Sequence, residues 1–170
     1  MKLNVLDRLG LRRLLTDGDE LDSEPRRGWV EDPWAQLWFA VHKHEWSTLA
    51  VVPADPAASP LAAARALAEA GRRYRGEGLV ELIDATESEP DEMRAVAATA
   101  AAAAATGAQV IVAVRSPLAQ AATIGLVRHM DAALLTVPLG EASLSRTRRA
   151  IESIGRERFI GSITIRRRHG

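Results

Sequence analysis

The sequence of 170 residues has the length of a single domain, and its 47% hydrophobic and 26% charged residues are typical of an ordinary globular protein. It contains no cysteine, which excludes a disulfide framework, a thiolate nucleophile and a cysteine-based metal site, and which fits a cytoplasmic protein. The 22 basic and 22 acidic residues cancel, and no aromatic and basic stacking pattern is present, so nucleic acid is not an expected partner.

The first part of the chain, residues 1–30, is predicted to lie outside the main domain. Leucines at near-helical spacing in residues 1–16 predict a short amphipathic helix, and the acidic stretch that follows predicts a linker. Charged residues among positions 7–13 interrupt any apolar run, which argues against a signal peptide. Residues 31–170 are therefore predicted to form a single α/β domain.

This domain is predicted to begin with a helix over residues 32–46. Asp32 can cap its N-terminus, and Pro33 suits its first turn. Trp34 and Trp38 fall on one face of the helix. Two interpretations of these indoles stay open. Either they fill the groove between the helix and the sheet, or they anchor a protein partner, because tryptophan is enriched in interface hot spots.

From residue 48 onward, short β-branched segments alternate with helical segments. The predicted strands span 48–53, 79–84, 109–114, 132–138 and 159–165, and the predicted helices span 60–74, 91–106, 118–130 and 143–154. Such alternation is typical of βαβ units and a parallel sheet. The predicted fold class is therefore α/β, with three layers and a mostly parallel sheet of about five or more strands.

One stretch, residues 95–114, contains no charged residue and is long enough to span a bilayer. Most of it is alanine, which contributes little to membrane insertion, and Gly107 divides it into two parts. We interpret it as a soluble helix followed by a strand, and expect no transmembrane segment.

The segment from Val51 to Gly71 has the layout of a phosphate-binding loop, with a strand, a tight loop and a helix. A P-loop has the pattern G-x-x-x-x-G-K-[ST], in which backbone N–H groups and the lysine bind phosphate and the hydroxyl binds Mg²⁺. The corresponding positions of this chain hold Ala54, Ser59, Pro60 and Leu61. The loop is therefore either a corner without a ligand or a site that holds a ligand in a non-standard way.

Several segments share their order and spacing with one known family. They are DPWAQLWFAVHKHEW, ALAEAG, LVELIDAT, VIVAVRSP, DAALLTVP and FIGSITI. In this order they resemble the cytoplasmic kinase domain of the bacterial tyrosine kinases of capsule and exopolysaccharide synthesis, which are relatives of the MinD/ParA P-loop ATPases. The resemblance covers most of the chain and implies a P-loop-ATPase-like (Rossmann-like) topology.

Catalytic positions of that family are replaced in this chain. The family's paired metal-binding acids are reduced to Asp84, with Thr86 at the second position. Val114, beside Arg115, replaces the acid that closes the third strand, and Ile165 replaces the base-reading asparagine. Phosphoryl transfer depends on charge stabilisation by lysine and Mg²⁺, so the resemblance implies a pseudo-enzyme without catalytic residues, metal or cofactor. Asp84 is either a capping residue at a strand exit or a remaining ligand-binding group.

Arginines are concentrated toward the end of the sequence. Together with Trp34 and Trp38, the candidates for a contact surface are Arg146, Arg149, Arg166, Arg167 and Arg168. The arginines face an anionic lipid or an acidic partner, or they are ordinary solvated surface charge. The family uses the helix with the tryptophans for contacts between subunits, so the resemblance makes a homo-oligomer a further option.

Taken together, these patterns predict a catalytically inactive regulatory or adaptor protein in bacterial exopolysaccharide or capsule synthesis or export. The expected partner is a membrane chain-length or export protein, or an active kinase paralogue. The protein is expected in the cytoplasm, or at the inner membrane through that partner. The alternative is an enzyme or sensor that binds a nucleotide or small molecule through residues 54–60 and Asp84.

Overall fold

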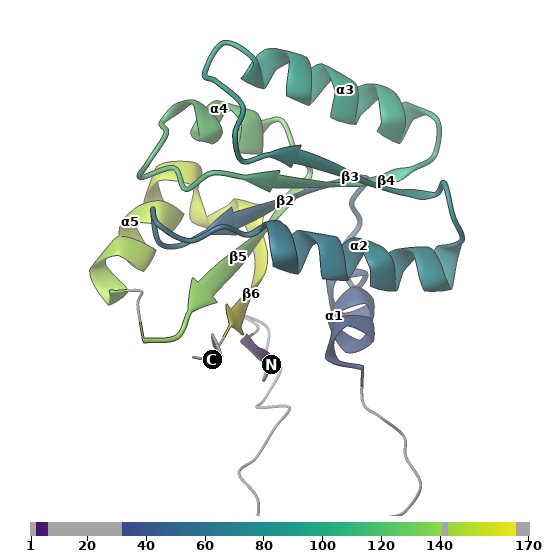
Figure 1. Ribbon diagram of the computed structural model, residues 1–170, viewed down its shortest axis with the longest axis horizontal. Helices are drawn as coiled ribbons and strands as arrows, with labels where there is room; N and C mark the ends of the chain where they lie inside the picture. The colour runs from purple at the N-terminus through teal and green to yellow at the C-terminus, as the bar shows by residue number, and fades with distance from the viewer. Residues whose placement is uncertain (1–2, 7–31, 141–142, 166–170) are drawn as a thin grey trace, which may run out of the picture.

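The computed structural model describes residues 3–6, 32–140 and 143–165. These residues form a six-stranded sheet with the order β1-β6-β5-β2-β4-β3 (Figure 1). Its strands are β1 (Leu3–Leu6), β2 (Thr48–Pro53), β3 (Val80–Ala85), β4 (Gln109–Val114), β5 (Ala132–Pro138) and β6 (Phe159–Ile165). Strands β2 to β6 pair in parallel, and β1 pairs antiparallel with β6 at one edge. The predicted parallel sheet is confirmed.

Helices cover both faces of this sheet. They are α1 (Pro33–Val41), α2 (Leu61–Arg75), α3 (Met93–Ala105), α4 (Ala122–Arg128) and α5 (Leu144–Ile154), with a 3₁₀ turn η1 (Arg156–Arg158) before β6. In Figure 1, α1 and α2 lie on one side of the sheet, and α3, α4 and α5 lie on the other. The molecule therefore has the three layers expected of its α/β class.

The central strand β2 shows how the sequence builds two cores. All of its residues are buried. Leu49 and Val51 join the apolar cluster beneath α1 and α2, whereas Ala50 and Val52 join the cluster beneath α3, α4 and α5. Side chains alternate between the faces of a strand, so a strand covered on both faces needs a continuous apolar run.

Helix α1 begins as predicted and ends earlier. The Asp32 carboxylate accepts hydrogen bonds from the backbone N–H groups of Trp34 (3.0 Å) and Ala35 (3.3 Å), and so caps the helix. The predicted end at Trp46 is wrong, because the helix stops at Val41. The Trp46 indole N–H folds back and donates to the Val41 carbonyl at 3.1 Å, which satisfies an acceptor at the helix end.

Two other predicted helices need correction. Leu3–Leu6 form strand β1 and not the start of a helix over residues 1–16, because the edge of β6 offers these backbone groups a partner. The rest of that predicted helix and the acidic linker lie outside the described residues. Helix α4 begins at Ala122 and not at 118, because the backbone N–H groups of Ala119 and Gln120 donate to the Ser116 carbonyl in a separate turn.

The uncharged stretch 95–114 divides as predicted into most of α3 and all of β4. Thr106 and Gly107 separate the two elements, and Gly107 has a φ of 93°, in the left-handed region where glycine is favoured. Within the part of the chain that the structure describes, no helix has both the length and the apolar character to cross a membrane.

Candidate functional site at the carboxyl end of strand β2

The topology places a candidate ligand position at the carboxyl end of β2. Strand β2 lies between β4 and β5. The helix that follows β2 covers one face of the sheet, whereas the helices that follow β4 and β5 cover the other (Figure 1). Where neighbouring connections leave toward opposite faces, the strand ends separate and α/β proteins bind their ligands. The candidate P-loop of the sequence, residues 54–60, lies at this position.

Three backbone N–H groups of this loop donate hydrogen bonds to acceptors within the chain. The Ala54 N–H donates to the Thr136 carbonyl at the end of β5 (2.9 Å). The Asp55 carboxylate accepts from the Ala57 N–H at 2.9 Å, and the Asp55 carbonyl accepts from the Ala58 N–H at 3.1 Å. A phosphate ligand of an ordinary P-loop is held by such loop N–H groups. Here Asp55 supplies the acceptors for two of these loop N–H groups.

The same loop is poor in donors for a second reason. Pro53, Pro56 and Pro60 have no N–H. The Ser59 hydroxyl accepts from the Leu61 N–H at 3.3 Å, so it serves the start of α2. Pro60 is buried at the N-cap, and the Leu61 side chain packs against the apolar cluster. The interpretation of this segment as a corner without phosphate chemistry fits these contacts.

The central feature of the site is an ion pair between Asp55 and Arg146. The guanidinium Nη1 of Arg146, on the first turn of α5, lies 3.0 Å from a carboxylate oxygen of Asp55. The Asp55 side chain is only 7% exposed, whereas the Arg146 side chain is 57% exposed. A buried carboxylate requires a partner, so this pair joins the loop after β2 to the helix after β5.

Sequence reasoning missed Asp55 and assigned Arg146 only to a contact surface. The available signal was an acid between two prolines, two residues after a buried strand. The partner of Asp55 lies 91 positions away in the sequence. Local patterns therefore gave no indication of the pair.

The other predicted site positions lie at the ends of β3 and β4. Asp84 is exposed, and its carboxylate accepts from the Thr86 N–H (3.0 Å) and the Thr86 hydroxyl (2.7 Å). The capping role is thus confirmed. Val114 is fully buried in β4. Arg115 donates to the Thr86 carbonyl (2.9 Å) and pairs with Glu87 (3.1 Å), so it ties the loops after β3 and β4 together.

The tryptophans of α1 divide between the two proposed roles. Trp38 is 2% exposed, so its assignment to an interface is wrong and the core interpretation is confirmed. Its ring lies against Gly71 of α2, where an added Cβ would come within 2.5 Å of the indole. Trp34 is partly buried against the same cluster and stays a candidate contact residue.

At the opposite end of β2, Asp131 joins β2 to β5. Its carboxylate accepts from the backbone N–H groups of Ser47 and Thr48 (both 2.8 Å) and from the Thr48 hydroxyl (3.0 Å). Burial alone would raise the pKa of Asp131, but these hydrogen bonds, with the charge of Arg158, outweigh it and hold the pKa below its ordinary value. These hydrogen bonds join two segments of the same chain, so we assign Asp131 a structural role at the amino end of β2.

Arg149 is exposed on α5, whereas Arg166, Arg167 and Arg168 lie outside the described residues. Among the residues that the structure describes, no three histidine, aspartate or glutamate side chains are grouped so that they could hold a metal ion.

The sequence matches no protein-family model, and a search of curated proteins finds no match.

Proposed function

We propose that this protein is a catalytically inactive, P-loop-like regulatory or adaptor module. The observation that carries the proposal is the Asp55–Arg146 ion pair at the carboxyl end of β2, in which the Asp55 carboxylate is nearly buried. Phosphoryl transfer needs cationic groups and Mg²⁺ around the phosphates. Here the buried group is an anion, and its carboxylate and carbonyl already accept from loop N–H groups. An added phosphate would meet repulsion and few donors.

The proposed biological setting is bacterial exopolysaccharide or capsule synthesis or export. Its support is the order of sequence segments, which is an argument from family analogy. In this setting, the module docks on a membrane chain-length or export protein, or on an active kinase paralogue. Such a partner would hold it at the cytoplasmic face of the inner membrane.

The test is a thermal-shift titration of the purified chain with Mg-ATP and Mg-ADP. A ligand that binds only the folded state stabilises it by about 2.7 kcal/mol at a hundredfold excess over its Kd. We expect no shift with either nucleotide. A saturable shift that Asp84→Ala abolishes would overturn the proposal and support the nucleotide-binding alternative. The control variant is Glu77→Ala, because Glu77 lies on an exposed turn.

The adaptor role has its own test, which is binding to the purified cytoplasmic segment of a chain-length protein or to a purified active kinase of this type. Isothermal titration calorimetry measures the affinity directly, and Trp34→Ala tests whether the half-buried indole of α1 contributes. We expect saturable binding to one of these partners. Binding to neither, with the chain folded, would contradict the polysaccharide setting but not the closure of the nucleotide site.

A further inference from the structure

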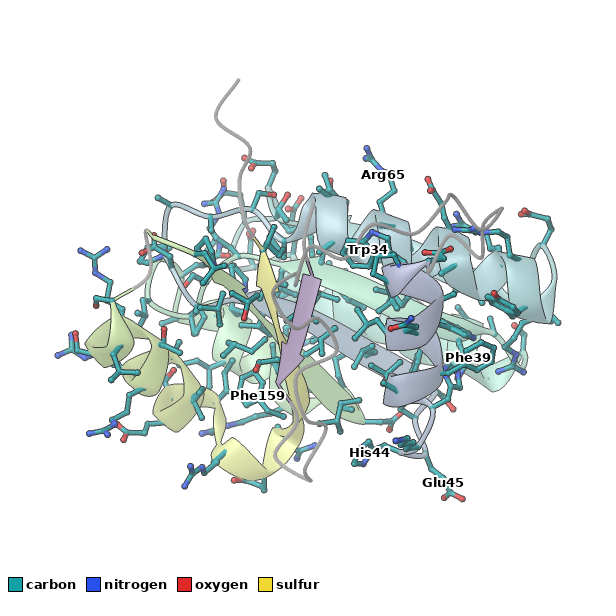
Figure 2. The ribbon with its side chains drawn as sticks, turned by 90° about the horizontal axis from the view of Figure 1, so that it is seen from below. Trp34, Phe39, His44, Glu45, Arg65 and Phe159 are labelled. Carbon is teal, nitrogen blue, oxygen red and sulfur yellow. The ribbon has the colours of Figure 1, made fainter. Side chains whose placement is uncertain are left out.

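A basic surface with exposed leucines lies where β5 leads into α5. We call it the α5 tip and define it by Leu139, Leu144, Arg148 and Arg149. Leu144 is 80% exposed and Leu139 is 42% exposed, and both arginines are exposed. Nitrogen-tipped side chains surround α5, the yellow-green helix at the left of Figure 2. The tip thus combines apolar side chains with cations.

The helix is built so that these groups face outward. Ser143 caps α5, since its hydroxyl accepts from the backbone N–H of Arg146 at 3.2 Å. Ala150 and Ile154 are buried and fix the inward face. Leu144 and the arginines therefore project from the opposite side. A large apolar side chain that is 80% exposed at a helix start contributes little to the core and leaves apolar surface open to a partner.

Helix α5 carries one exposed acid, Glu152, against three arginines, and a denser acidic cluster lies elsewhere. The loop between β3 and α3 contains Glu87, Glu89, Asp91 and Glu92, and no lysine or arginine. Helix α4 contacts both α3 and α5, and so lies between this loop and the α5 tip. Packed helices are 8–10 Å apart, which puts the axes of α3 and α5 about 20 Å apart. This exceeds the Debye length of about 8 Å at physiological salt, so a partner can bind the basic tip without strong repulsion from the acids.

We propose that the α5 tip docks on an anionic lipid bilayer, with the leucines in the interfacial layer and the arginines among the headgroups. Charge complementarity favours the anionic surface, and exposed leucines beside arginines favour lipid over a purely acidic protein. The Leu139 N–H donates to the Ile165 carbonyl at 2.9 Å, which ties the tip to the end of β6. The inference does not depend on the proposed adaptor function.

The test measures co-sedimentation of the full chain with vesicles of phosphatidylcholine, alone or mixed with phosphatidylglycerol. We expect binding only to the anionic vesicles, and less of it when the salt is raised to about 0.5 M. Each arginine near an anionic surface contributes about fivefold to partitioning, so Arg148→Glu/Arg149→Glu is expected to weaken binding more than tenfold. Leu144→Ser is expected to weaken it about tenfold through loss of apolar burial.

Matched controls lie on other surfaces of the molecule. Arg65→Glu/Arg75→Glu reverses two exposed charges on α2, across the sheet from the tip, and Leu79→Ser removes a leucine that is 43% exposed. These variants are expected to bind vesicles like the parent chain. Circular dichroism melting shows whether each variant is folded, and only folded variants are compared.

Three outcomes would overturn the proposal. The first is equal binding to neutral and anionic vesicles, and the second is an equal loss of binding in the α2 control. The third is that the parent chain binds no vesicles, while light scattering shows that Arg148→Glu/Arg149→Glu changes the mass of the protein in solution. That third result would make the tip an interface between copies of this chain. Retained anionic binding that only the tip variants lose would support the proposal.

Discussion

The two ends of strand β2 each carry one aspartate, and the two side chains work differently. At the amino end, Asp131 is exposed, and its carboxylate accepts three hydrogen bonds from Ser47 and Thr48. At the carboxyl end, Asp55 accepts from its own loop, is nearly buried, and pairs with Arg146 from a distant helix. One aspartate joins adjacent strands near the surface, and the other is a nearly buried charge that a distant arginine compensates.

This difference shows which end is costly to disturb. Water can replace the partners of an exposed carboxylate, whereas a buried carboxylate that loses its cation is left without compensation. In this fold class, a ligand normally occupies the carboxyl ends of the strands. Here the protein's own ion pair lies at this place, so we expect it to contribute to the stability of the fold.

The largest expected effect comes from removing one large core side chain near the amino end of β2. Trp38 lies on Gly71 and beside Trp46, just before β2 begins. Trp38→Ala is expected to lower the free energy of unfolding by about 3–5 kcal/mol, as large-to-small changes in cores do. Urea denaturation measures it. The matched control is Phe39→Ala on the same helix, where the ring is 56% exposed, and its cost is expected to be much smaller. Equal costs would contradict the core role of Trp38.

The second prediction concerns the carboxyl end. Arg146→Ala leaves the Asp55 carboxylate buried without its cation, and is expected to destabilise the fold by about 1–3 kcal/mol. Arg149→Ala, on the same helix with an exposed side chain, is the control and is expected to change stability by less than about 0.5 kcal/mol. In the double variant Arg146→Ala/Asp55→Asn, the costs should not add, because both changes remove the same interaction. Strict additivity would show that the pair contributes nothing.

These contrasts also explain what the sequence could predict. The strand positions of β2, β4 and β5 follow from continuous, largely apolar runs, because a parallel sheet buried on both faces needs them. The short apolar run Leu3–Leu6 suits a helix or a strand equally, and pairing with β6 decides between them. The stripe containing Trp38 fits a core or an interface, and only its packing on Gly71 resolves the choice.

The candidate site was predictable in place but not in content. The βαβ order puts residues 54–60 at a strand end, where ligands are expected. The ion pair that fills this place joins residues 91 positions apart, and no periodicity or turn signal connects such residues. Asp84, near the end of β3, was predictable as a capping residue, and its carboxylate accepts from the Thr86 N–H and hydroxyl in its own loop.

The smallest expected effect is at the amino end. Asp131→Asn removes the charge while keeping an acceptor, and is expected to cost at most about 1 kcal/mol near neutral pH because the group is well exposed to solvent. The pKa of Asp131 is lowered in the folded state. Its charged form therefore stabilises the fold above the unfolded pKa of about 3.9, and this contribution disappears as the pH falls through the lower folded value. Urea denaturation at several pH values should show the gap between the parent chain and Asp131→Asn narrowing below pH of about 4. A gap that stays constant across this range would mean that the carboxylate charge does not act, and that the clamp works through hydrogen-bond geometry alone.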